Sequence, residues 1–332
     1  MTEREELLRL PFDQYQRYRV AADLAARLGV RPGAQVGDVG GAPGRVEAFF
    51  PEHCTFVVDL AAEPHDRFVL GSGDRLPFAS GAFDVVIALD TLEHVPVDRR
   101  AAFLAELRRV SDLVIVSAPF LGEEVLLAEQ ALGEFVTARL GEFPTLDEHA
   151  EHGLPDLDAT VGELEHDGWV ARTLPSGYLP RWLVGMILHH ELLATGLPEL
   201  PGLHAYYNAT VSRLDCREPS YRHVVVASRT VPAAELDAAV DALRSTHSDE
   251  EGRVALRALA SALFSERIGG ALRSGDLAAA QERAELLRAE VADRDAHIIE
   301  LRENLNVANG RIDALETRLT ERILTKVRRK RR

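Results

Sequence analysis

Apolar residues along positions 1–120 follow two spacings in turn. Short, nearly continuous apolar runs are typical of strands buried on both faces, and apolar residues three or four apart are typical of amphipathic helices. Strands are predicted over 35–39, 55–60, 83–89 and 113–118. Helices are predicted over 12–28 and 97–110, and another is predicted to start at 45–50. Strands and helices in this alternation predict βαβ units and a parallel sheet.

The pattern becomes less regular over 121–230. Helices are predicted over 123–140 and 181–194, and strands over 169–174 and 223–228. Between them, 145–155 is polar and contains two histidines, His149 and His152. Residues 231–275 are predicted to form helical connections.

A seven-residue apolar repeat extends over 277–325. Its first position holds Leu277, Ala284, Val291, Ile298, Leu305, Ile312 and Leu319. Its second position holds Ala280, Leu287, Leu301, Ala308 and Leu315, interrupted by Arg294 and Arg322. This spacing predicts a coiled coil, and an apolar stripe of this kind needs a partner helix. Because the chain has one such run, we expect the partner to be a second copy, in a parallel homodimer.

The tail 326–332 contains six basic residues in seven. A cluster of this kind can contact an anionic membrane surface. We expect instead that the tail is a solvated end of the chain that makes no membrane contact.

Composition narrows the class of protein. Hydrophobic residues make up 46% of the 332 residues, which is enough for a sizeable core. The net charge of −15 disfavours nucleic-acid binding, which requires a phosphate-neutralising surface. Cys54 and Cys216 cannot build a disulfide framework. The sequence shows no signal peptide and no membrane-length apolar stretch, so we expect a cytoplasmic protein.

The first predicted strand leads into a glycine-rich turn, Gly40-Gly41-Ala42-Pro43-Gly44. Such a turn between a strand and a helix brings the backbone close to a ligand. The dinucleotide-binding fingerprint would need glycines at 40, 42 and 45. Position 45 is Arg45, so the sequence disfavours this fingerprint and therefore a nicotinamide-dependent dehydrogenase. The pattern acid-x-Gly-x-Gly-x-Gly is matched by Asp38, Gly40 and Gly44, with Ala42 adding a methyl group in the middle.

Three further motifs follow in order. Asp59 ends the second predicted strand, where a carboxylate can accept both hydroxyls of a ribose. The segment 73–86 reads GDRLPFASGAFDVV, and 90–96 reads DTLEHVP. In this order and spacing, the chain resembles the class I S-adenosylmethionine-dependent methyltransferases, in the branch with D-x-LPF, FD-V and LEHV segments. The resemblance covers about 12–230.

The resemblance implies a Rossmann-like, doubly wound α/β fold with a seven-stranded sheet whose last strand is antiparallel. By that analogy, 223–228 is the reversed strand and 169–174 is its neighbour. The chain would then divide into four parts. A methyltransferase domain at 1–230 would contain an acceptor-side insertion at about 121–220. A helical connector at 231–276, the coiled coil at 277–325 and the basic tail at 326–332 would follow it.

The resemblance also implies which residues line the cofactor S-adenosylmethionine. The turn from Gly40 to Gly44 would pass under its methionine part, and Asp38 would hold the ammonium. Asp59 would take the ribose hydroxyls, Asp74 would accept from the adenine amino group, and Asp90 would lie beneath the sulfonium. The full implied set is Asp38, Gly40, Gly41, Ala42, Gly44, Asp59, Leu60, Asp74, Arg75, Leu76 and Asp90.

Two histidines are candidates for the catalytic base. Methyl transfer from a sulfonium is an in-line displacement, and an alcohol or phenol acceptor needs a base, for which histidine is suited near neutral pH. His94 follows the predicted strand 83–89, although it and Glu93 could merely cap the next helix. His152 belongs to the polar segment 145–155, which could equally be a solvated lid.

A metal site is the alternative use of the residues around His94. Asp90, Glu93 and His94 are similar to the acid-x-x-Glu-His cluster of quinone-pathway O-methyltransferases, and such a cluster can bind a divalent cation. Because LEHV also occurs in metal-free relatives, we expect no metal.

These features together predict an S-adenosylmethionine-dependent methyltransferase (EC 2.1.1.-) that methylates an oxygen of a small molecule or glycan. The added coil is similar to that of bacterial surface-polysaccharide methyltransferases held in assemblies. The alternative is a coiled-coil scaffold whose methyltransferase domain binds cofactor without catalysing transfer.

Overall fold

A computed structural model describes residues 3–42, 45–61, 67–141, 144–195 and 200–245. The chain divides into two units, Met1–Gly269 and Gly270–Arg332, and every described residue belongs to the first. The predicted coiled coil, the basic tail, most of the helical connector and Gly44 lie outside the described residues. Among the helices that are described, none is both long and apolar enough to cross a bilayer.

Seven strands form one sheet in the order β3-β2-β1-β4-β5-β7-β6. The strands are β1 Gln35–Val39, β2 Cys54–Asp59, β3 Phe68–Leu70, β4 Val85–Leu89, β5 Leu113–Pro119, β6 Val170–Tyr178 and β7 Ser220–Ser228. β7 is antiparallel to both of its neighbours, and the other pairings are parallel. The expected Rossmann-like sheet with a reversed last strand is therefore confirmed.

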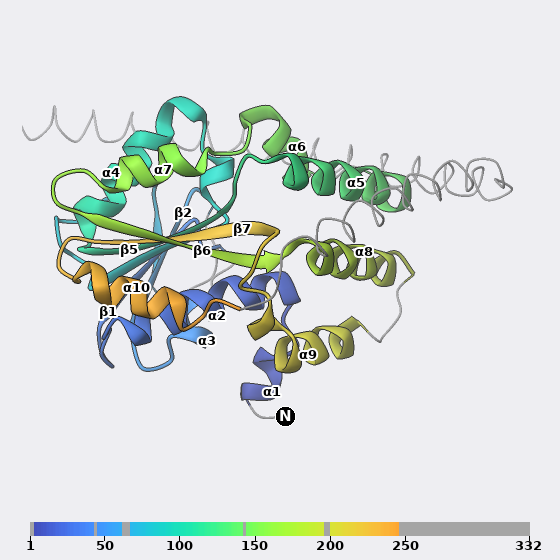
Figure 1. The fold of residues 1–332 in the computed structure, drawn as a ribbon, viewed down its shortest axis with the longest axis horizontal. Coiled ribbons are helices and arrows are strands. Elements are labelled where there is room, and N and C mark those ends of the chain that lie inside the picture. The colour runs from blue at the N-terminus through green and yellow to red at the C-terminus, as the bar shows by residue number, and fades with distance from the viewer. Residues whose placement is uncertain (1–2, 43–44, 62–66, 142–143, 196–199, 246–332) are drawn as a thin grey trace, which may run out of the picture. The chain divides into compact units, whose positions relative to one another are not determined.

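Helices cover both faces of this sheet, with α2, α3 and α10 on one side and α4 and α7 on the other (Figure 1). The helices are α1 Glu3–Leu7, α2 Phe12–Arg27, α3 Val46–Phe49, α4 Arg100–Val110, α5 Glu123–Leu140, α6 Pro144–His152, α7 Leu157–Leu164, α8 Leu179–Thr195, α9 Leu200–Thr210 and α10 Ala233–Asp241. Short 3₁₀ turns lie at Leu92–His94, Val97–Arg99 and Ser212–Leu214. The helix predicted over 97–110 is thus divided into a 3₁₀ turn and α4.

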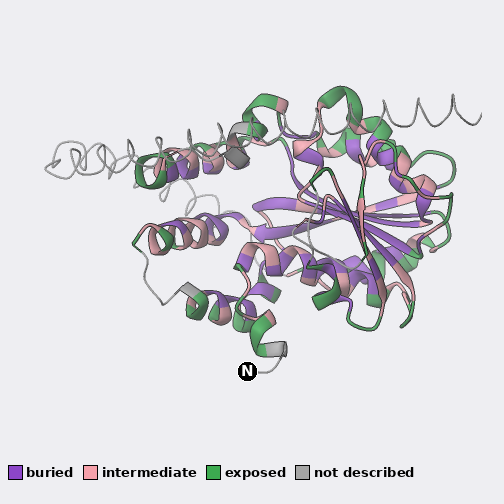
Figure 2. Cartoon of the chain, turned by 180° about the vertical axis from the view of Figure 1, so that it is seen from behind, coloured by how far each residue is buried: buried purple, intermediate pink, exposed green. Residues whose placement is uncertain are grey.

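The sheet separates two apolar cores. Every residue of β4 is buried, and successive side chains point to opposite faces: Ile87 packs with Leu24 of α2, and Val86 packs with Leu107 of α4. Full burial of a leucine contributes roughly 1.5–3 kcal/mol. Figure 2 shows the central strands buried and the outward faces of the helices exposed. The continuous apolar runs of the sequence therefore correspond to strands covered on both faces.

A third apolar cluster lies outside the sheet, among α5, α8 and α9. It includes Leu132, Leu183 and Tyr207, together with Phe12 of α2. α5 follows the carboxyl end of β5, and α8 follows that of β6. This cluster therefore stands beside the edge of the sheet where the parallel strands end, and ligands bind at that edge in open α/β sheets.

Candidate active site

A cavity of about 280 Å³ opens at the carboxyl ends of β1, β2 and β4. It brings together residues from four separate motifs of the sequence. Those that were predicted to bind or act are Gly40, Asp59, Leu60, Asp74, Asp90 and His94. We refer to this cavity as the acidic cleft, because three of its lining side chains are carboxylates.

The turn after β1 can be made only with very small residues. Gly40 has a φ of +76°, and a Cβ there would lie 2.2 Å from Cγ2 of Thr91. A Cβ on Gly41 would lie 2.2 Å from a carboxylate oxygen of Asp38. The Thr91 hydroxyl donates to the carbonyl of Val39 at 3.2 Å and fixes the other side of the turn. The glycines thus let the backbone pass between β4 and the Asp38 carboxylate.

Asp59 lies at the end of β2 and faces the acidic cleft. One of its oxygens accepts from the amide of Ala42 at 3.1 Å, and the other accepts from the amide of Leu60 at 2.6 Å. The carboxylate therefore ties the glycine turn to β2, and its remaining lone pairs are available to a ligand. Leu60 itself is 75% exposed.

Asp74 lines the opposite part of the cleft. It accepts from the Ser72 hydroxyl at 2.5 Å and lies 3.5 Å from Nη1 of Arg99. The amides of its two successors are already engaged, since Arg75 donates to the carbonyl of Ser72 and Leu76 donates to Glu106. Any adenine held at Asp74 would therefore have to share those amides.

Asp38 is fully buried beneath the glycine turn. The Tyr18 hydroxyl donates to one carboxylate oxygen at 2.7 Å. The other oxygen, Oδ1, has no hydrogen-bond partner among the described residues. Burial raises the pKa of Asp38 to about 7, against the opposing effects of the Tyr18 hydrogen bond and the Arg17 charge. Because Oδ1 of Asp38 is buried without a partner among the described residues, a cationic hydrogen-bond donor bound above the turn could supply that partner.

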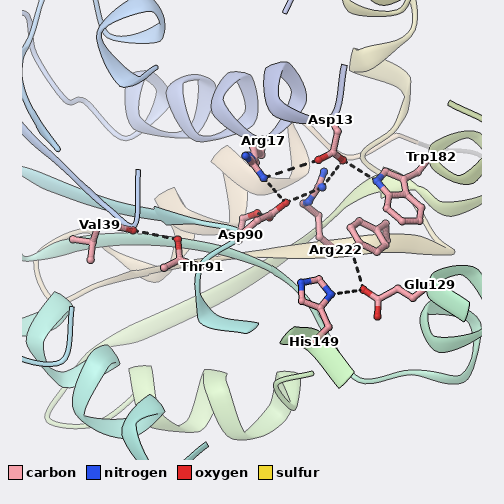
Figure 3. Close-up of polar contacts among 11 residues, drawn as sticks. Asp13, Arg17, Val39, Asp90, Thr91, Glu129, His149, Trp182 and Arg222 are labelled. Atoms are coloured by element: carbon pink, nitrogen blue, oxygen red, sulfur yellow. Dashed lines mark hydrogen bonds and ion pairs between the residues drawn. The ribbon is translucent and has the colours of Figure 1, made fainter. Parts of the chain in front are cut away.

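Asp90 directly follows β4 and joins a buried network of ion pairs (Figure 3). Arg17 and Arg222 approach one of its oxygens at 3.0 and 2.9 Å, and the Ser117 hydroxyl donates to the other at 2.6 Å. Asp13 pairs with Arg222 at 2.5 Å and also accepts from the Trp182 indole. Burial would raise the pKa of Asp90, but the two guanidiniums outweigh it and hold that pKa well below its usual range. Asp90 is thus an anion at neutral pH.

A second cavity, of about 610 Å³, lies between α5 and α6. Its walls are largely apolar, with Leu126, Leu146 and Leu154 among them, and Glu129 and His149 supply polar groups. The segment 145–155 could have been a solvated lid according to its sequence. In the structure most of it belongs to α6, and it provides one wall of this cavity. We refer to this second cavity as the side cavity.

His94 and His149 are neighbours, one in the wall of each cavity, and we refer to this pair as the junction of the two cavities. His94 lines the acidic cleft, His149 lines the side cavity, and their ring centres are 4.9 Å apart. Nδ1 of His94 lies 2.7 Å from Glu148, and Nδ1 of His149 lies 2.8 Å from Glu129. Burial and the neighbouring His149 lower the pKa of His94, in opposition to Glu148. His94 is therefore neutral at pH 7 and able to accept a proton.

Glu93 lies beside this pair and is 1% exposed. Burial, followed by the charge of Asp90, raises the pKa of Glu93 well above its ordinary value. Glu93 and His94 do not cap the next helix, because the cap positions before the 3₁₀ turn Val97–Arg99 and before α4 are Pro96 and Arg99.

His152 is placed differently from His94. Leu146, His149, Ala150 and Gly153 follow an i, i+3, i+4, i+7 pattern and line the side cavity. His152 falls outside that face, and it is not among the described residues lining either cavity. Its backbone carbonyl accepts from Arg100 at 3.3 Å. The structure therefore brings His149, and not His152, beside His94.

Sequence reasoning missed several buried partners at this site. Tyr18 and Arg17 belong to a helix whose apolar spacing was recognised but whose polar residues received no role. Arg222 was overlooked because it lies one residue before the predicted strand 223–228, whereas β7 begins at Ser220 and includes it. Glu129 lies 20 residues from His149, and only the packing of α5 against α6 brings them together.

Residues 40–112 match the sequence profile of a family described as "Methyltransferase domain". The chain is 30% identical over 176 residues to an uncharacterized methyltransferase of Mycobacterium sp. (strain JLS), covering 45% of this chain and 68% of that protein. It is 27% identical over 192 residues to one from Mycolicibacterium gilvum (strain PYR-GCK), covering 51% and 71%. Among solved structures it is similar to magnesium protoporphyrin IX methyltransferase from Synechocystis PCC 6803 with bound SAH. There the TM-score is 0.40 at 17% identity, with 68% of this chain and 86% of that chain covered.

Proposed function

This chain belongs to the methyltransferase family, and on that premise we propose that it transfers a methyl group from S-adenosylmethionine to an oxygen of a small molecule or glycan. The observation that carries the proposal is the acidic cleft. It gathers Gly40, Asp59, Asp74 and Asp90 around one cavity at the carboxyl edge of a doubly wound sheet.

The residues of the cleft fit this cofactor. Asp38 has a buried oxygen lacking a partner within the described ranges, and a methionine ammonium would supply that partner. The free lone pairs of Asp59 match two ribose hydroxyls. A Cβ at Gly40 would clash with Thr91 and one at Gly41 with Asp38, so the close turn that would pass under the methionine part requires glycine at both positions. The cofactor supplies an activated methyl group on a sulfonium, and the chain supplies binding and alignment.

The side cavity supports a small acceptor. Its volume of about 610 Å³ lies within the range of small-molecule sites. His94, at the junction of the two cavities, is the proposed base for the acceptor hydroxyl, with Glu148 on Nδ1 to orient the ring. His152 stays a second candidate base. General-base help of this kind is worth about 10²–10⁴-fold in rate.

Calorimetry with S-adenosylhomocysteine tests the cofactor site. Asp59→Asn and Asp74→Asn should each weaken binding by roughly 1–3 kcal/mol, because each removes charge-assisted hydrogen bonds. Asp84→Asn is the matched control. Asp84 is an exposed carboxylate at the start of β4, at the opposite edge of the sheet, and accepts from the amide of Gln35. Unchanged affinity in both cleft variants would refute the ribose and adenine roles.

A further inference from the structure

Three side chains at the junction of the acidic cleft and the side cavity converge on one point. Glu93 and His94 come from the 3₁₀ turn after β4, and His149 comes from α6. One ligand atom from each can be chosen so that all three atoms lie within 4.8 Å of one another. Oε2 of Glu93 and Nε2 of His149 are buried, and neither has a hydrogen-bond partner in the described part of the chain. Unpaired buried donors and acceptors are costly, so their convergence points to a missing ligand.

The outer contacts of the two imidazoles are those of metal ligands. Each ring has its Nδ1 at hydrogen-bond distance from a carboxylate, Glu148 for His94 and Glu129 for His149. Such contacts fix the tautomer that leaves Nε2 free to bind a cation. Glu129 is itself held by the hydroxyl of Tyr221, which donates at 3.0 Å. Figure 3 shows His149 and Glu129 meeting beside the buried ion pairs.

The donor set differs from the acid-x-x-Glu-His cluster that the sequence suggests. Asp90, the first acid of that cluster, is already engaged by Arg17, Arg222 and Ser117, so it is not free to bind a cation. His149, which lies 55 positions further along the chain than His94, takes its place. This pairing depends on how α6 packs and could not be found from the spacing of residues in the sequence.

The geometry points to a divalent-cation site made of Glu93, His94 and His149 that takes Zn²⁺. Two imidazole nitrogens and one carboxylate oxygen are a set that zinc binds in catalytic sites, leaving one position open. Mg²⁺ prefers an all-oxygen set and binds poorly to imidazole. Because His94 lines the acidic cleft and His149 lines the side cavity, a bound ion would lie between the proposed cofactor site and the proposed acceptor site.

The role of the ion, though not its binding, rests on the proposed function. A zinc ion held by these residues would make an acceptor hydroxyl bound to it lose its proton more easily, as it does for bound water. The proton passes to water, an oxygen–carbon bond forms, and the sulfur–carbon bond of the sulfonium breaks to leave a neutral thioether. With the ion in place, His94 would be one of its ligands and would not itself accept the proton of the hydroxyl.

Zinc binding to the untagged full-length chain tests the proposal. The chain is stripped with EDTA, the chelator is removed, and Zn²⁺ or Mg²⁺ is titrated against a competing chromogenic chelator. Elemental analysis gives the metal content per chain. The variants are Glu93→Gln, which keeps the side-chain size, His149→Gln, and Glu129→Gln, which removes an outer partner. His166→Gln is the matched control, because His166 is an exposed histidine outside the cluster.

We expect one zinc per chain, little affinity for Mg²⁺, and unchanged zinc binding in His166→Gln. Glu129→Gln should raise the zinc dissociation constant about 10–100-fold, and loss of a direct ligand should raise it further. Thermal unfolding in EDTA establishes that each variant is folded, and added zinc should raise the melting temperature of the parent but not of the ligand variants. No saturable zinc binding by the parent, parent-like binding in folded Glu93→Gln and His149→Gln, or equal binding of Mg²⁺ would each overturn the site.

Calorimetry with S-adenosylhomocysteine on the same samples separates the two proposals. Zinc binding without cofactor binding would leave the metal site standing and refute the proposed function. Cofactor binding without zinc binding would refute the metal site and leave the proposed function standing.

Discussion

Replacing Asp38 by asparagine should stabilise the fold at high pH and weaken the cofactor site at the same time. Asp38 is fully buried, and burial raises its pKa from 3.8 to about 7 in the folded chain. Between these two values the unfolded chain has lost a proton that the folded chain still holds. Raising the pH through this window therefore favours unfolding.

The size of the effect follows from the shift. The pKa of Asp38 rises from 3.8 to about 7 on folding. At about 1.36 kcal/mol per pKa unit, this lowers the free energy of unfolding of the parent by about 4 kcal/mol between pH 4 and pH 8. The amide introduced by Asp38→Asn does not titrate, and its side-chain oxygen can still accept from Tyr18. The difference in the free energy of unfolding between Asp38→Asn and the parent should therefore grow by about 4 kcal/mol across this range.

Urea unfolding of both chains at pH 4, 6 and 8 and constant ionic strength measures this difference. Contributions from other titrating groups are shared by the two chains and cancel. Calorimetry with S-adenosylmethionine should show parent affinity rising by up to about tenfold per pH unit below pH 7, as Asp38 ionises, and a weaker, flatter profile for the variant. A stability difference that stays constant from pH 4 to pH 8 would refute the reasoning.

Three further predictions concern the buried ion pairs, the base and the coil. Arg222→Met should lower the free energy of unfolding by about 3–5 kcal/mol in urea, because it leaves buried carboxylates without their partner; a loss under about 1 kcal/mol would contradict this. His94→Ala, or His152→Ala if that residue is the base, should reduce methyl transfer about 10²-fold at nearly unchanged cofactor affinity; parent rates in both would rule out both. Light scattering should find a dimer for the full chain and a monomer for a chain ending at Gly275, whereas monomers in both would refute assembly through the coil.

Much of the fold could be predicted because its strands are buried on both faces. The predicted strand 35–39 coincides with β1, and 113–118 falls one residue short of β5. β3 escaped prediction because its apolar run, Phe68–Leu70, is only three residues long and none of the three is fully buried. Long apolar runs indicate strands that are buried on both faces, whereas a run of three residues is too short to distinguish a strand from other structure.

The site could be predicted only where its residues follow one another in a motif. The cleft residues Asp59, Asp74 and Asp90 lie at strand ends or in loops whose order sets their position. His149 was seen in the sequence, but its inward direction depends on α6 packing against α5, with Leu146 on the same face. Arg222 and Asp13 are 209 positions apart, and only the completed sheet makes them a pair.

A crystal structure of the chain with S-adenosylhomocysteine tests the central claim most directly. We predict that the ribose hydroxyls contact Asp59, the adenine lies at Asp74, and the sulfur faces the junction beside His94 and His149. The account would be contradicted if the acidic cleft were empty at a saturating concentration of the compound. It would also be contradicted if the compound were bound elsewhere on the chain.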